Sequence, residues 1–177
     1  LLTAVICWVV RQRYIIVGLL IAVIGSTLFT FVTKMIFERA RPIDILLLES
    51  TYSFPSGHAT VTVALYGFLA YIAIRFSERF AVQVRIVMIT ILLTVLIGVS
   101  RIVLNEHYLS DVLGGYLVGT LWLTVAISIT EWLTTKDKIN WPSTWSTAQI
   151  YTVWLSIASV LMSTLIYAGI YQFPLLL

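Results

Sequence analysis

Three short polar clusters interrupt an otherwise apolar sequence, and they hold both of its histidines. The clusters are Lys34 with Arg41 and Pro42, then the run Pro55–His58, and then Ser100 and Arg101 followed by His107 and Asp111. Each cluster falls at the end of a long apolar run. Basic side chains and helix starts are groups that bind anions. The pattern therefore predicts one anion-binding site at a membrane surface.

The second cluster has the composition of a helix start. Pro55 and Ser56 favour the beginning of a helix, and His58 would lie in its first turn. Unpaired backbone N–H groups and the positive end of the helix dipole make such a start a seat for phosphate. The missing side chain of Gly57 would let an anion approach closely. Taken alone, this cluster would favour a capped helix with an interfacial histidine.

His107 and Asp111 are four residues apart, a spacing that puts two side chains on one face of a helix. Asp111 could then accept a hydrogen bond from the imidazole. The second ring nitrogen would be left free and more basic, as a nucleophilic histidine requires. The alternative is a surface ion pair that has no catalytic role.

Lys34, Arg41 and Arg101 supply three cations beside these histidines. The two arginines can bind phosphate oxygens in a forked geometry, and Lys34 adds a point charge. The alternative is that these long side chains only reach toward the membrane interface. We expect Glu38 and Arg39 to be solvated or paired with each other.

The composition places the chain in a lipid bilayer. Hydrophobic residues make up 60% of the 177 residues and charged residues 11%, and the mean hydropathy is +1.00. This is too apolar for a soluble domain. The net charge of +3 comes from scattered basic residues without the contiguous stripe that would bind nucleic acid. The single cysteine, Cys7, lies in an apolar run and is expected to be a packing residue.

The apolar runs predict an all-α polytopic membrane bundle of about six spans, forming one domain over residues 1–177. The predicted spans are Leu1–Val10, Tyr14–Thr33, Ala59–Ile74, Ile86–Val99, Val112–Thr130 and Ile150–Tyr171. Their lengths suit helices better than the strands of a barrel. Since the first run is too short to cross a bilayer, we expect a truncated first span and a domain that is part of a longer chain.

Successive connections alternate between the two membrane faces, which places all three polar clusters on the same face. The opposite face carries seven of the eleven basic residues, namely Arg11, Arg13, Arg75, Arg79, Arg85, Lys136 and Lys138. The positive-inside rule makes that opposite face cytoplasmic. We therefore expect an integral protein of a bacterial inner (plasma) membrane whose site lies on the extracytoplasmic face.

The three clusters also match the motifs of a known family. KMIFERARP at residues 34–42 fits KxxxxxxRP, PSGH at residues 55–58 is complete, and SRIVLNEHYLSD at residues 100–111 fits SRxxxxxHxxxD. The chain resembles the type 2 phosphatidic acid phosphatase superfamily, which includes lipid phosphatases, glucose-6-phosphatase, bacterial acid phosphatases and vanadium haloperoxidases. The motifs cover residues 30–115, and no motif position departs from the family's pattern.

The resemblance implies a role for each motif residue. His107 would attack phosphorus to form a phosphohistidine, Asp111 would position His107, and His58 would protonate the leaving oxygen. The phosphate would be held by Lys34, Arg41, Ser56, Gly57 and Arg101. We expect neither a metal nor another cofactor, because fixed cations and backbone donors can stabilise the charge that develops during phosphoryl transfer.

These features together predict a metal-independent phosphatase that acts on the terminal phosphate of a membrane lipid phosphate or pyrophosphate. Candidate substrates are undecaprenyl pyrophosphate, preferred for a bacterial source, phosphatidylglycerol phosphate and phosphatidate. The expected partners are this substrate and the bilayer, without nucleic acid. The alternative is a non-catalytic transporter or flippase-like protein that binds an anionic lipid headgroup. Such a protein would not need His107 beside Asp111.

Overall fold

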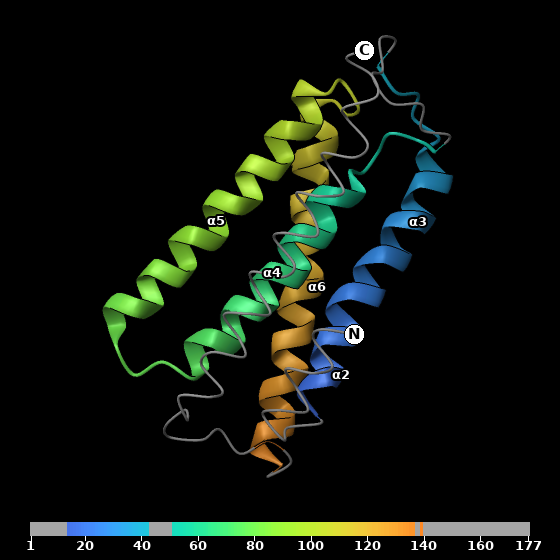
Figure 1. The fold of residues 1–177 in the computed structure, drawn as a ribbon. Coiled ribbons are helices and arrows are strands. Elements are labelled where there is room, and N and C mark those ends of the chain that lie inside the picture. The colour runs from blue at the N-terminus through green and yellow to red at the C-terminus, as the bar shows by residue number, and fades with distance from the viewer. Residues whose placement is uncertain (1–13, 43–50, 137–138, 140–177) are drawn as a thin grey trace, which may run out of the picture.

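The structure, a computed structural model, describes residues 14–42, 51–136 and 139. In these residues it is a helical bundle without strands, which confirms the predicted all-α class (Figure 1). The elements are α2 (Ile15–Leu20), the π-helical segment η1 (Ile21–Gly25), α3 (Ser26–Phe37), α4 (Gly57–Arg75), α5 (Phe80–Val103) and α6 (Leu109–Thr135).

Four helical segments of the described chain are long and apolar enough to cross a bilayer. They are Ile15–Phe37, which runs through α2, η1 and α3, followed by α4, α5 and α6. Each covers a predicted apolar run to within a residue and continues past it, because a helix can extend through polar residues such as Arg85 and Arg101 into the interface. The predicted spans Leu1–Val10 and Ile150–Tyr171 lie outside the described residues, so the full number of spans stays a prediction.

Helix α4 lies between α5 and α6 and packs against both (Figure 1). Two glycines of α6 allow its close approach to α4. A Cβ atom at Gly115 would come within 2.6 Å of the backbone oxygen of Ser56, and one at Gly119 within 2.5 Å of that of Thr60. Small residues are the usual means by which membrane helices approach closely. Here they bring the start of α6 against the start of α4.

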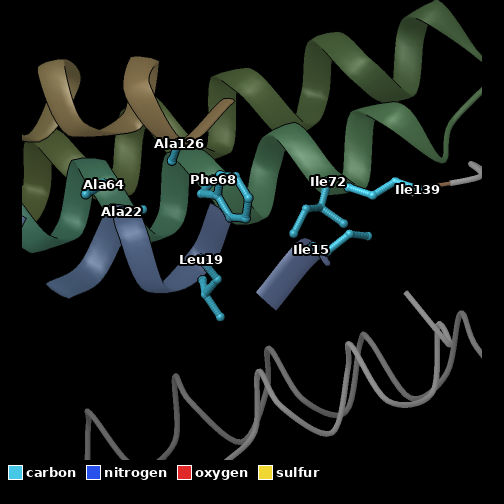
Figure 2. Close-up of a cluster of buried hydrophobic side chains, with 8 residues drawn as sticks. All are labelled: Ile15, Leu19, Ala22, Ala64, Phe68, Ile72, Ala126 and Ile139. Carbon is cyan, nitrogen blue, oxygen red and sulfur yellow. The ribbon is translucent and has the colours of Figure 1, made fainter. Parts of the chain in front are cut away.

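The buried apolar core is formed mainly by residues of α2, η1, α4 and α6 (Figure 2). It consists of Ile15, Leu19, Ala22, Ala64, Phe68, Ile72, Ala126 and Ile139. The Phe68 ring occupies space left by Gly18, where a Cβ atom would lie 2.5 Å from the ring. Many large apolar side chains of α3 and α5 are exposed instead, including Ile36 and Met88. Such surfaces suit contact with lipid tails.

The connections that carry the polar clusters meet at one end of the bundle. The end of α3, the start of α4, the end of α5 and the start of α6 all lie there (Figure 1). Contacts between the clusters confirm the arrangement: the Arg41 guanidinium donates to the backbone oxygen of Glu106, and Ser56 N–H donates to that of Asp111. The three clusters therefore share one end of the bundle, as the alternation of spans predicts.

Candidate active site

A cavity of about 350 Å³ opens at this end of the bundle. Its walls come from α3, α4 and the connections, and consist of Thr27, Thr30, Lys34, Arg41, Thr51, Gly57, His58, Val61 and His107. At about 30 Å³ per water molecule, the cavity could hold roughly a dozen waters, so it is larger than one phosphate group. Five of the predicted site residues line it together. The other three, Ser56, Arg101 and Asp111, lie behind or beside this lining.

The start of α4 has the geometry of an anion-binding site. Ser56 is the N-cap, with an extended backbone at φ −70° and ψ 114°, and Gly57 is the first helical residue. A Cβ atom at Gly57 would meet only the methyl group of Thr30, at 3.9 Å. Unlike Gly115, Gly57 is therefore not required by packing against the described protein. Its missing side chain instead leaves the cavity open beside the first N–H groups of the helix.

Two buried hydroxyl groups beside this helix start lack partners. Within the described part of the chain, Ser56 Oγ and Thr30 Oγ1 make no hydrogen bond. Buried polar atoms in folded proteins almost always have a hydrogen-bond partner, and leaving such an atom without a hydrogen bond costs about 1–3 kcal/mol. Thr30 lines the cavity and Ser56 lies behind its lining, next to Gly57, so a ligand bound at the helix start could supply the missing bonds.

Lys34 and Arg41 are oriented by backbone carbonyl groups. The Lys34 ammonium donates to the carbonyls of Tyr52 and Ser53. The Arg41 guanidinium donates to the Thr51 carbonyl at 2.7 Å, to the Thr51 hydroxyl at 2.9 Å and to the Glu106 carbonyl at 3.1 Å. These bonds hold both cations in the wall of the cavity, where their positive charge can act on an anion.

Arg101 has a different environment from the one the sequence suggests. Its Nη1 lies 3.0 Å from the carboxylate of Glu106, which is only 1% exposed, and Arg101 does not line the cavity. The sequence pattern could not show this pairing, because Glu106 falls at an unspecified position of the third motif. A role for Arg101 in phosphate binding therefore stays a prediction and would require exchange of the carboxylate for phosphate.

His107 lies in the connection between α5 and α6. The prediction that His107 and Asp111 lie on one face of the same helix is therefore wrong. Helix α6 begins only at Leu109, after Tyr108 in an extended conformation. Asp111 is the third residue of the helix, and its carboxylate accepts the backbone N–H of Tyr108 at 2.9 Å. This capping interaction favours a helix that starts after His107 rather than before it.

His107 and Asp111 are nevertheless close, and Ser53, which the motifs do not include, lies between them. Nδ1 of His107 lies 3.7 Å from the carboxylate of Asp111, which is too long for a hydrogen bond, and 3.4 Å from the hydroxyl of Ser53. The Ser53 hydroxyl donates to Asp111, and Arg39 pairs with the other carboxylate oxygen at 2.7 Å. The expectation that Arg39 is solvated or paired with Glu38 is therefore wrong.

The pKa of His107 is lowered to about 4 by burial, followed by the positive charges of Arg41 and Lys34. The charge of Asp111 and a hydrogen bond to the backbone of Ser53 act in the opposite direction and offset only part of this shift. The imidazole is consequently neutral at neutral pH, so its contact with Asp111 is not an ion pair. A neutral ring has a lone pair available, which a nucleophile requires.

His58 is exposed in the first turn of α4 and lines the same cavity as His107. The two imidazoles come from different elements, so each can contact a bound ligand from its own side. One buried, neutral ring and one accessible ring suit a nucleophile and a proton donor, respectively. The cavity thus combines two cations, a helix start and two histidines.

Comparisons with known proteins place this arrangement in a family. Residues 15–135 match the PAP2 superfamily. The chain is 36% identical over 108 residues to phosphatidylglycerophosphatase B of Bacillus subtilis (strain 168), covering 59% of this chain and 53% of that protein. It is 30% identical over 95 residues to lipid phosphate phosphatase delta of Arabidopsis thaliana, covering 50% of this chain and 23% of that protein. The chain thus spans about half the length of the first relative.

The fold is also similar to a solved structure, described as the first transmembrane PAP2 type phosphatidylglycerolphosphate phosphatase from Bacillus subtilis. The TM-score is 0.67 at 29% sequence identity, over 73% of this chain and 65% of the other. Together with the four apolar helices, this similarity identifies the chain as an integral membrane protein.

Proposed function

The chain belongs to the PAP2 superfamily, and from this membership and the geometry of the cavity we propose that it is a membrane lipid phosphatase. The observation that carries the proposal is a buried, neutral His107 in one cavity with Lys34, Arg41 and the start of α4. A transporter that only binds headgroups would need the cations but gains nothing from a buried imidazole. We therefore favour a catalytic function over a transport function.

The proposed reaction begins with binding of the terminal phosphate. Lys34, Arg41 and the first N–H groups of α4 would bind its oxygens, and Ser56 Oγ would gain the partner it lacks. A phosphoryl-transfer transition state carries negative charge on its equatorial oxygens. Cations and backbone donors that are already held in place stabilise that charge without reorganisation. No metal ion is required in this scheme.

Transfer then proceeds in two steps. In the first, Nε2 of His107 attacks phosphorus, the bond to the lipid oxygen breaks, and His58 gives that oxygen a proton. In the second, His58 takes a proton from water, the water oxygen attacks phosphorus, the bond from phosphorus to Nε2 of His107 breaks, and inorganic phosphate leaves. Splitting the hydrolysis in this way replaces one difficult step by two easier ones. The residues of a single transmembrane domain suffice for both.

The names of the relatives guide the proposed substrate. Both named relatives are phosphatases of lipid phosphates, and the Bacillus relative is a phosphatidylglycerophosphatase. We therefore place phosphatidylglycerol phosphate before undecaprenyl pyrophosphate and phosphatidate. All three present a terminal phosphate at the membrane interface.

The full-length protein in detergent should release inorganic phosphate from phosphatidylglycerol phosphate in the presence of EDTA. Vanadate should inhibit this release, because it can adopt the five-coordinate geometry of the transition state. Phosphate release is measured over time with each of the three lipids. An absolute requirement for a divalent metal would contradict the metal-independent mechanism, and no release from any lipid would contradict the phosphatase function.

We propose that the site faces the extracytoplasmic side of a bacterial inner membrane, as the distribution of basic residues favours. Two exposed positions at opposite ends of the bundle provide a matched test, Ala40 near the site and Glu78 between α4 and α5. After Cys7→Ser removes the cysteine of this chain, a membrane-impermeant thiol reagent should label A40C in intact cells. E78C should react only after permeabilisation. The reverse pattern would place the site in the cytoplasm.

A further inference from the structure

The carboxylate of Asp111 is held from two sides by residues that none of the three motifs specifies. One oxygen accepts a hydrogen bond from Arg39 at 2.7 Å, and the other accepts the Ser53 hydroxyl and the backbone N–H of Tyr108. The Asp111 side chain is fully buried. Because water does not reach it, these protein donors determine how the carboxylate is oriented.

Ser53 lies between Asp111 and His107. Its hydroxyl oxygen is closer to Nδ1 of His107, at 3.4 Å, than the Asp111 carboxylate is, at 3.7 Å. The 3.4 Å separation is at the outer limit of a hydrogen bond, and such contacts often tighten when substrate binds. A serine hydroxyl has one proton and two lone pairs. Since the proton is donated to Asp111, the Ser53 hydroxyl can act toward Nδ1 only as an acceptor, and a hydrogen bond there requires the imidazole proton on Nδ1.

Arg39 and Ser53 form one unit around Asp111. The backbone carbonyl of Arg39 accepts the backbone N–H of Ser53 at 2.8 Å. The Arg39 guanidinium also donates to the hydroxyl of Ser110 at 2.7 Å and lies 4.4 Å from the centre of the Tyr108 ring. These contacts fix a side chain that would otherwise be mobile in solvent, and a guanidinium over an aromatic face is favourable. Neither Arg39 nor Ser53 lines the cavity.

We propose that Ser53 and Arg39 are positioning residues for the nucleophile. Ser53 connects Asp111 to Nδ1 of His107 and keeps the proton on that nitrogen, which leaves the lone pair of Nε2 free to attack. Arg39 holds Asp111 in the orientation that Ser53 requires. The aspartate is thus connected to the histidine by hydrogen bonds through a serine, while its charge also acts directly on the nearby ring. This inference rests on the proposed phosphatase function.

Ser53→Ala tests the connection, because it removes only the hydroxyl group from a buried site. We expect kcat to fall about tenfold to a hundredfold, while KM changes by less than about twofold, because Ser53 does not contact the cavity. Ser26→Ala is the matched control, since it removes another buried serine hydroxyl, one that donates to the backbone carbonyl of Val23 and lies outside the cavity lining. It should leave kcat unchanged. An equal loss in both variants, or an unchanged kcat in Ser53→Ala, would overturn the role of Ser53.

Arg39 provides a second test that does not depend on the folding of the Ser53 variant. Arg39→Met removes the charge and the donors, whereas Arg39→Lys keeps the charge and one donor. We expect Arg39→Met to lower kcat with little change in KM, and Arg39→Lys to recover part of the loss. Equal rates for wild type and Arg39→Met would overturn the role of Arg39.

A measurement of the imidazole tautomer separates this inference from the phosphatase function. The chain contains two histidines, so nitrogen NMR signals of His107 can be assigned with a His58→Asn variant. At neutral pH, His107 should carry its proton on Nδ1, and Ser53→Ala should populate the other tautomer. This result is independent of any substrate. Protonation on Nε2 in the unaltered protein, or a tautomer that Ser53→Ala leaves unchanged, would overturn the proposal even if lipid phosphates are hydrolysed.

Discussion

Replacing His107 with asparagine should abolish phosphate release, with kcat lower by about ten-thousandfold or more. The expected loss is large because asparagine cannot form the covalent intermediate, and the remaining groups can only bind and polarise the phosphate. Asparagine is polar and smaller than histidine, so the connection between α5 and α6 should keep its structure. Single-turnover hydrolysis of phosphatidylglycerol phosphate measures the effect.

The control for His107→Asn is binding of vanadate or inorganic phosphate, which should persist because Lys34, Arg41 and the start of α4 remain. Activity within about tenfold of the unaltered protein would contradict covalent catalysis by this residue.

The pH dependence provides a second check. Because the pKa of His107 is lowered to about 4, the ring gains a proton as the pH falls through that value. Formation of the phosphohistidine should therefore be lost as the pH falls through about 4 and should not be lost near neutral pH.

Replacing His58 with asparagine should lower kcat for a lipid phosphate by about a thousandfold, within the range of general acid–base catalysis. The alkoxide of a lipid alcohol is a poor leaving group and needs a proton as the bond to phosphorus breaks. An aryl phosphate has an acidic leaving group that needs no such proton. In single-turnover release of the leaving group, which reports the first step alone, the loss in His58→Asn should therefore be much smaller with an aryl phosphate than with phosphatidylglycerol phosphate.

His107→Asn is the matched control for the leaving-group test, because loss of the nucleophile should affect both substrates equally. If His58→Asn reduced the hydrolysis of both substrates by the same factor, His58 would be a phosphate ligand rather than a proton donor. The comparison of single-turnover leaving-group release from the two substrates in both variants therefore distinguishes these roles.

The described helices could be predicted from the sequence because each apolar run is bounded by charged or polar residues. The ends of the helices could be predicted less closely. The predicted span Ile86–Val99 continues as a helix from Phe80 to Val103, since the backbone bonds of a helix do not depend on apolar side chains. The same limitation explains the error at His107, where a capping bond between Asp111 and Tyr108 delays the start of α6.

The shared cavity followed from the alternation of spans, which brings Lys34, Gly57 and His107 to one end of the bundle. The contacts between connections could not be inferred in this way. Ser53 lies two residues before the start of the second motif, and no spacing rule relates it to Asp111. Arg39 reaches Asp111 because Glu38 ends α3 in a left-handed conformation, at φ 43°, and redirects the chain. Such a turn at a non-glycine residue is uncommon and carries no clear sequence signal.

Trapping the covalent intermediate tests the central claim most directly. The protein would be mixed rapidly with a lipid phosphate that is radiolabelled in its terminal phosphate, quenched within one turnover, and digested for mass spectrometry. We predict labelled phosphate on Nε2 of His107, formed before inorganic phosphate appears and absent from His107→Asn. Release of phosphate without labelled protein at any time, or a label on another residue, would contradict a histidine nucleophile at position 107.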